Sequence, residues 1–145
     1  MKAGSNLRPI GSSLGTVSDW MSHEPSAVVE DCPIRWALAQ MEQGGFRHLL
    51  VLDGERLSGI VSSRDVRRLA VEDLHAPLLA EPVRKIMTED PVTIGAGEPV
   101  TDAARLLLEL KIGALPVRGP DGIVGIFTTA DALEALLAVV ETSAS

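Results

Sequence analysis

Two short segments of the chain carry a hydroxyl and a carboxylate at the same spacing. Ser62 stands three residues before Asp65, and Thr128 stands three residues before Asp131. Each pair is predicted to open a helix, where free backbone N–H groups and the helix dipole favour an anion. The same residue types are also common helix caps, which stabilise a helix by about 1 kcal/mol. The spacing therefore leaves two compatible interpretations, an anionic ligand site and ordinary capping.

Residues suited to catalysis or metal binding are sparse. His23, His48 and His75 have neither metal-ligand spacing nor a nucleophile partner that the sequence identifies. Cys32, directly before Pro33, is most simply a helix-start residue. The chain has no glycine-rich phosphate loop and no dinucleotide-binding fingerprint. We expect no catalytic residue, no metal site and no required cofactor.

The elements that position the two hydroxyl–carboxylate pairs belong to an internal repeat. Met21 aligns with Met87 at an offset of 66 residues (87 − 21), and the register continues without insertion. The identical pairs are Val17/Val83, Pro25/Pro91, Pro33/Pro99, Ala37/Ala103, Leu49/Leu115, Val51/Val117, Gly59/Gly125, Ile60/Ile126 and Asp65/Asp131. Glycine, proline and aspartate falling in one register indicate two copies of one supersecondary unit.

Each copy is predicted to be a β-α-β-β-α unit, which makes the fold class α/β (α+β). The first copy reads as a strand at Val28–Val29, a helix from Pro33 to Gly44–Gly45, strands at Leu49–Leu52 and Leu57–Val61, and a helix from Ser63 to about Leu74. The second reads as Val92–Ile94, Pro99 to Gly113, Leu115–Arg118, Ile123–Phe127, and a helix from Thr129 to near Glu141. One copy is too small to close its own core, so the two must pack together.

The predicted organisation follows from this repeat. Residues 1–16, rich in glycine and serine, are expected to form a flexible arm. The first domain spans 17–74, a proline-containing linker 75–82, the second domain 83–141, and a tail 142–145.

At these residues the chain resembles the CBS domain, the family named after cystathionine β-synthase. The resemblance rests on the repeated pattern Val-x-x-x-Met-[Ser/Thr]-x-x-Pro and, later in each copy, Gly-Ile-φ-[Ser/Thr]-[Ser/Thr]-x-Asp, and it covers about Val17–Val140. It implies a tandem pair, called a Bateman module, packed with pseudo-twofold symmetry and with two clefts between the repeats. Many members bind AMP, ADP, ATP or S-adenosylmethionine there, and many form dimers.

The resemblance also implies roles for particular residues. Asp65 and Asp131 match the family's aspartate that holds the ribose hydroxyls, and Ser62 and Thr128 match its phosphate-contacting hydroxyl. The adenine is expected against two extended segments, whose residues are Ser26 and Val28 in the first copy and Val92 and Ile94 in the second.

The two copies differ in charge beside these motifs. Arg47-His48 precedes the middle strand of the first copy, where the second has Gly113-Ala114, and Arg64 stands where the second has Ala130. Some family members have basic residues at this place that reach the phosphates, and Arg47 could bind a phosphate in bidentate fashion while His48 adds a pH-dependent donor. The other interpretation is a solvated start of a strand.

Composition narrows the range of functions. The net charge of −7 makes nucleic acid an unlikely partner, because phosphate binding requires cations. A single cysteine and the absence of a signal peptide or long apolar run suggest a cytoplasmic protein without a membrane segment.

The function most consistent with these features is a regulatory, ligand-sensing module that binds an adenosine-containing ligand and acts on a partner in trans. It is expected to be a homodimer. The alternative is a ligand-free dimerisation scaffold that keeps the fold for its helical faces.

Overall fold

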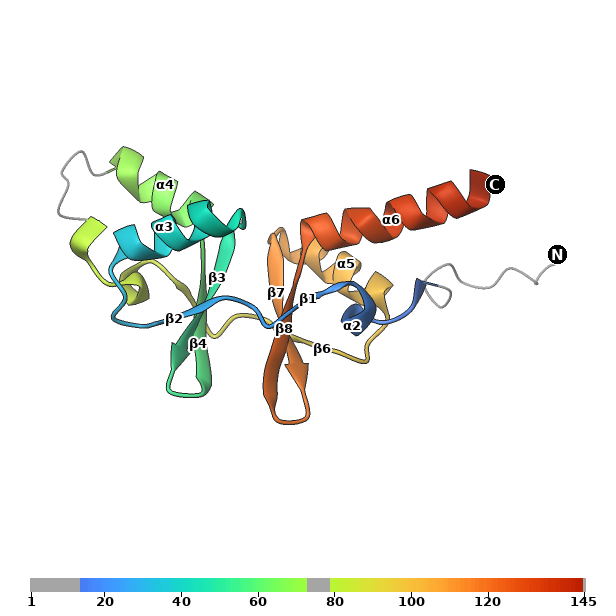
Figure 1. Ribbon diagram of the computed structural model, residues 1–145, viewed down its shortest axis with the longest axis horizontal. Helices are drawn as coiled ribbons and strands as arrows, with labels where there is room; N and C mark the ends of the chain where they lie inside the picture. The colour runs from blue at the N-terminus through green and yellow to red at the C-terminus, as the bar shows by residue number, and fades with distance from the viewer. Residues whose placement is uncertain (1–13, 73–78, 145) are drawn as a thin grey trace. The chain divides into compact units, whose positions relative to one another are not determined.

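The computed structural model describes residues 14–72 and 79–144, which form two compact units (Figure 1). The central unit consists of Pro25–Pro91, and the split unit consists of Met1–Glu24 together with Val92–Ser145. Residues 1–13 of the predicted arm and 75–78 of the predicted linker lie outside the described residues, whereas Thr16, predicted to belong to the arm, bridges to Pro99 and caps α2 (Val17–Trp20).

The central unit is a four-stranded sheet with two helices. Its elements in chain order are β2 (Ala27–Val29), α3 (Ile34–Gly44), β3 (His48–Asp53), β4 (Arg56–Ser62), α4 (Ser63–Glu72), the 3-10 turn η2 (Val83–Lys85) and β5 (Thr88–Glu89). The strand order is β2-β3-β4-β5; β2 runs parallel to β3, and the other neighbours are antiparallel. Helices α3 and α4 lie against this sheet (Figure 1).

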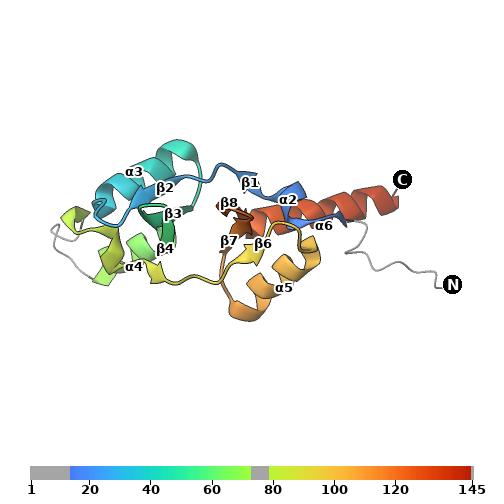
Figure 2. The same cartoon turned by 90° about the horizontal axis from the view of Figure 1, so that it is seen from below.

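The split unit repeats this arrangement with a different leading segment. Its elements are α2 (Val17–Trp20), β1 (Ser22–His23), β6 (Ile94–Gly95), α5 (Val100–Leu110), β7 (Ala114–Gly119), β8 (Gly122–Thr128) and α6 (Thr129–Ala144). The strand order is β1-β8-β7-β6, and α2 lies beside α6 (Figure 2). The predicted α+β class and the β-α-β-β-α order of each copy are confirmed.

The two copies exchange their leading segments. Residues at the start of the first copy join the split unit, where the amides of Val17 and Ser18 donate to the carbonyls of Glu98 and Ala96 at 2.9 and 3.0 Å. The segment at the start of the second copy makes the equivalent bonds in the central unit, from the Val83 amide to the Cys32 carbonyl at 2.8 Å and from the Arg84 amide to the Glu30 carbonyl at 3.2 Å. Each compact unit is therefore built from parts of both sequence repeats.

Each exchanged segment packs closely against a glycine in the strand with which it pairs. Strand β1 pairs with β8 and places Ser22 and Met21 against Gly125. Strand β5 pairs with β4 and places Thr88 and Met87 against Gly59. A side chain at either glycine would collide with a strand carbonyl, which explains why glycine stands in the same register in both copies.

Each unit has an apolar core built mainly from aliphatic side chains. In the central unit the buried face of α3 (Ile34, Ala37, Met41) packs with residues of β3 and β4. In the split unit the face of α5 packs with β7, β8 and the leading segment, whose Val17 is fully buried. The apolar positions of the sequence pattern therefore face the two cores, and the polar positions face the surface.

Several predicted boundaries were wrong. Pro33 and Pro99 were predicted to be the first helical residues. They are instead N-cap residues, each one residue before α3 and α5 begin. Helix α5 ends at Leu110, before the predicted Gly113, since Lys111 takes the left-handed conformation that Gly45 takes after α3. Helix α6 continues past Glu141 to Ala144.

No helix within the described residues is both long and apolar enough to cross a membrane.

Replacing Gly125 with alanine should destabilise the protein, because the added methyl carbon would lie 2.7 Å from the Ser22 carbonyl oxygen and 2.5 Å from the Met21 sulfur. We expect the free energy of unfolding to fall by about 2 kcal/mol in urea denaturation. Gly97→Ala is the matched control, since a methyl group there meets no atom within 4 Å. Equal stability of the two variants would contradict the close contact.

Candidate functional site

Asp65 lies at the start of α4, in a reciprocal contact with the end of β4. Its Oδ2 accepts a hydrogen bond from the Ser62 amide at 3.0 Å, and its own amide donates to the Ser62 hydroxyl at 3.1 Å. The carboxylate thus caps the helix by one oxygen, while Oδ1 accepts no hydrogen bond from a described residue. Capping and ligand binding are compatible here, since the cap uses half of the carboxylate.

Asp131 repeats this geometry at the start of α6. Its Oδ2 accepts from the Thr128 amide at 2.8 Å and from the Thr128 hydroxyl at 3.2 Å. The side chain is more buried than that of Asp65, with Asp131 only 8% exposed. Burial raises the pKa of the Asp131 carboxyl, against the two hydrogen bonds from Thr128 and with a smaller contribution from Glu134. A group that donates to this carboxylate would offset part of the cost of burying its charge.

Both helix starts are tied to the loop before the middle strand. The Ser63 amide donates to the Arg47 carbonyl at 2.9 Å, and the Thr129 amide donates to the Gly113 carbonyl at 3.1 Å. Strand pairing places His48 opposite Ser62 and Ala114 opposite Thr128. The structure therefore brings residues distant in sequence to the side of each hydroxyl–carboxylate pair. These backbone links were not predicted from the sequence, because a β-bulge in each hairpin, between Val51 and Leu52 and between Val117 and Arg118, shifts the pairing by one residue from a count back from the turn.

In the central unit this arrangement gathers charge around His48. Burial lowers the pKa of His48 below its usual value near 6.5; the Asp65 carboxylate acts in the opposite direction, and Arg47 and Arg64 add to the lowering. The lowered pKa of His48 favours the neutral imidazole, while the exposed Arg47 and Arg64 carry positive charge beside Asp65. The equivalent positions of the split unit are Gly113, Ala114 and Ala130, which carry no charge.

The segments predicted to contact adenine lie at sheet edges. Ser26 is exposed before β2, and its carbonyl accepts from the Leu50 amide at 3.1 Å. Val92 is exposed before β6, whereas the side chains of Val28 and Ile94 are buried in the apolar cores. Because β2 and β6 are edge strands, the backbone of these segments can contact a base, while the Val28 side chain cannot cover its face.

In the described part of the chain no group of three or more His, Cys, Asp or Glu side chains is arranged to hold a metal ion. Cys32 is half-buried, and burial raises the pKa of its thiol, which disfavours the reactive thiolate.

Comparison with known sequences identifies the family of this chain. The family model for the CBS domain matches residues 17–72 and 83–138. A CBS domain-containing protein of Dictyostelium discoideum is 32% identical over 136 residues, covering 86% of this chain and 93% of the relative.

Solved structures show the same fold. The chain superposes on CBSX2 in complex with AMP with a TM-score of 0.73 and 30% identity, covering 86% of this chain and 98% of that one. It superposes on the CBS domain pair of protein MJ0100, in complex with 5′-methylthioadenosine and S-adenosyl-L-methionine, with a TM-score of 0.74 and 26% identity, covering 83% and 98%. The chain belongs to the CBS-domain family and carries two CBS domains in tandem.

Proposed function

We propose that this protein is a regulatory module that binds an adenosine-containing ligand and acts on a partner protein in trans. The observation that carries the proposal is the duplicated geometry at the starts of α4 and α6. In both, a hydroxyl and an aspartate share a helix N-terminus and leave one carboxylate oxygen without a bond to a described residue. The candidate ligands are AMP, ADP, ATP and S-adenosylmethionine.

The charges around Asp65 and Asp131 suggest that the two sites bind ligands of different charge. Arg47 and Arg64 beside Asp65 can neutralise phosphates, whereas Gly113, Ala114 and Ala130 beside Asp131 cannot. We therefore assign a phosphorylated adenosine to the site of the central unit. A neutral or cationic adenosine derivative is the better fit to the split unit, because it brings no negative charge near the buried Asp131 carboxylate.

A ligand-free dimerisation scaffold is the second candidate, and the outer face of α6 favours it. Leu133, Leu136, Leu137 and Val140 follow one another at helical spacing, and each is 54% exposed. Helix α4 offers less exposed apolar surface for a dimer than expected, because Val66 is buried in the core of the central unit. Both candidates include a homodimer that buries this face of α6.

The ribose contact is tested with Asp65→Asn and Asp131→Asn, since asparagine keeps an acceptor for the capping amide but removes the charge. We expect each change to weaken ligand binding at its own site about tenfold or more, measured by calorimetry with AMP and S-adenosylmethionine. The control is Asp19→Asn, because Asp19 caps α2 by the same bond from Thr16, at 2.9 Å, outside the proposed site. Unchanged affinity in all three variants would mean that the aspartates only cap helices.

The phosphate contact is tested with Arg47→Ala. Because only the phosphates would meet the guanidinium, we expect ATP to bind about three- to tenfold more weakly and adenosine to be almost unaffected. Added salt should reduce the difference, since Arg47 is exposed. Arg67→Ala, at an exposed position of α4, is the matched control. Equal losses of affinity for ATP and adenosine would indicate that Arg47 stabilises the fold and does not contact the phosphates.

The half-buried imidazole of His48 should make stability depend on pH. Its pKa is lower in the folded protein than in the unfolded chain, so the unfolded chain gains the proton first as the pH falls below about 6.5. Urea denaturation should show a lower free energy of unfolding at about pH 5.5 than at about pH 7.5, and a smaller drop in His48→Gln. His23→Gln, at an exposed position, serves as the control. Parallel pH profiles for His48→Gln and the parent would contradict this prediction.

The dimer is tested with Leu137→Glu, which places a charge in the exposed face of α6. Light scattering should give twice the chain mass for the parent and the chain mass for the variant. Leu108→Glu on α5 is the control, because Leu108 is 79% exposed but lies outside this face. A monomeric parent protein at micromolar concentration would exclude the dimer.

A further inference from the structure

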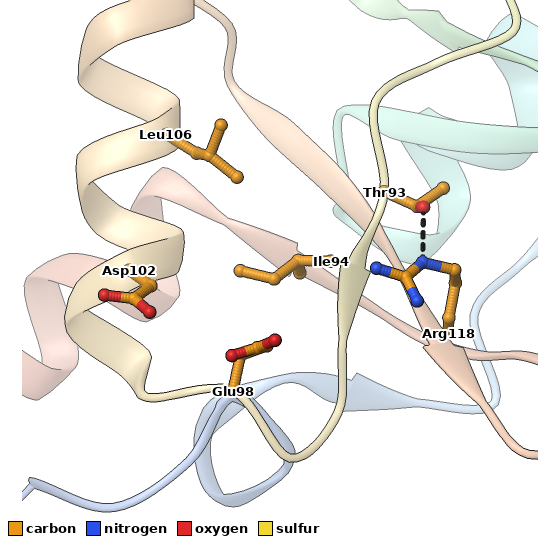
Figure 3. A pocket seen from close by; sticks show the side chains of 6 residues that line it. All are labelled: Thr93, Ile94, Glu98, Asp102, Leu106 and Arg118. Atoms are coloured by element: carbon orange, nitrogen blue, oxygen red, sulfur yellow. Dashed lines mark hydrogen bonds between the residues drawn. The ribbon is translucent and has the colours of Figure 1, made fainter.

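The split unit contains a hollow of about 250 Å³ beside β6 and the start of α5 (Figure 3), and neither Thr128 nor Asp131 belongs to its lining. It is lined by Thr93, Ile94, Glu98, Asp102, Leu106 and Arg118. Ile94, predicted from the sequence to face adenine, lines this hollow with its side chain. The lining thus combines two apolar side chains with two carboxylates and a guanidinium.

In the hollow, the Ile94 side chain lies between the positive Arg118 and the two carboxylates (Figure 3). The Arg118 Nε donates to the Thr93 hydroxyl at 2.7 Å, which holds the guanidinium beside the Thr93–Ile94 segment. Glu98 and Asp102 lie on the other side of Ile94 (Figure 3). Asp102 forms an exposed ion pair with Arg105 at 3.4 Å, while neither Glu98 nor Arg118 forms an ion pair with another described residue. Opposite charges therefore face one hollow without neutralising each other.

The first sequence repeat shows that the fold does not require these charges. At the offset of 66 residues, Arg118 corresponds to Leu52, Glu98 to Cys32 and Asp102 to Trp36. The backbone is the same in both units, since α3 and α5, and β3 and β7, occupy equivalent ranges. All three charged side chains are thus a property of the split unit alone, and their shared location requires an explanation other than folding.

We propose that this hollow binds a small zwitterion whose carboxylate and ammonium groups are separated by a short apolar chain. The carboxylate pairs with the Arg118 guanidinium, which has terminal N–H groups remaining after its bond to Thr93. The ammonium group lies between Glu98 and Asp102, and the methylene groups lie on the half-buried Leu106 and on the small exposed edge of Ile94, which is 4% exposed. A ligand with one charge would leave the opposite end of the hollow unpaired. The proposal does not rest on the nucleotide site.

The exposure of the charged side chains sets the expected affinity. Glu98, Asp102 and Arg118 are all exposed, so water and salt screen their interactions. A small molecule that makes two such contacts and covers two aliphatic side chains binds in about the millimolar range. The site therefore suits a metabolite that is abundant in the cell.

The test is a titration of the ¹⁵N-labelled full chain with 5-aminopentanoate, followed by amide chemical shifts. Pentanoate and pentylamine serve as ligands that each lack one charged end. We expect 5-aminopentanoate to shift the amides of Thr93, Ile94 and Asp102 and to bind about fivefold or more tightly than either single-charge ligand. Equal binding of pentylamine would show that the carboxylates act alone, and would overturn the proposal, as would the absence of shifts at these amides.

Two variants locate the two charged ends. Arg118→Gln should remove the preference for 5-aminopentanoate over pentylamine, and Glu98→Gln should remove its preference over pentanoate. Arg56→Gln, an exposed strand arginine of the central unit that pairs with Asp53, is the matched control and should bind like the parent. The dispersion of each spectrum reports folding directly. Retained preferences in folded Arg118→Gln and Glu98→Gln proteins would exclude this site.

Discussion

The structure depends on the close approach of a strand carbonyl to a glycine in each hairpin. Gly59 and Gly125 allow β5 and β1 to pair with β4 and β8, because neither carries a Cβ that would meet the incoming backbone. This pairing brings Met87 and Met21 into contact with the glycines and carries Val83 and Val17 into the two cores. Each core is therefore completed by a segment that lies outside its own sequence repeat, so neither repeat can form its compact unit alone.

The same hairpins determine where the side chains of the candidate site lie. Strands β4 and β8 end at Ser62 and Thr128, and the helices begin at the next residue, so the hydroxyl and the aspartate three residues later share a helix N-terminus. The amides of Ser63 and Thr129 then bind carbonyls of the loops before β3 and β7. A shift of one residue in either hairpin would move the hydroxyl to the other face of its sheet and separate it from its aspartate.

Much of this arrangement could be predicted from the sequence, because glycine, proline and aspartate recur in one register. The repeat predicted the elements, and the hydroxyl–carboxylate pairs predicted where α4 and α6 begin. The exchange of leading segments could not be predicted, since Val17 and Val83 occupy the same place in the pattern whichever core they join. The end of α5 was missed because Lys111 adopts a left-handed conformation that the glycine rule assigns to Gly113. The hollow lined by Arg118 was missed because its charges are spread over a loop, a helix and a strand.

Two copies of one backbone thus differ mainly in where they hold charge. Beside the helix starts, the central unit has Arg47 and Arg64 and the split unit has none at the equivalent positions. Around the hollow beside β6 and α5, the split unit has Glu98, Asp102 and Arg118, where the central unit has uncharged residues. Since the backbone elements occupy equivalent ranges in both units, one fold is compatible with both distributions of charge. The two sites proposed above follow from this tolerance, because one copy can change its charges while the other keeps its own.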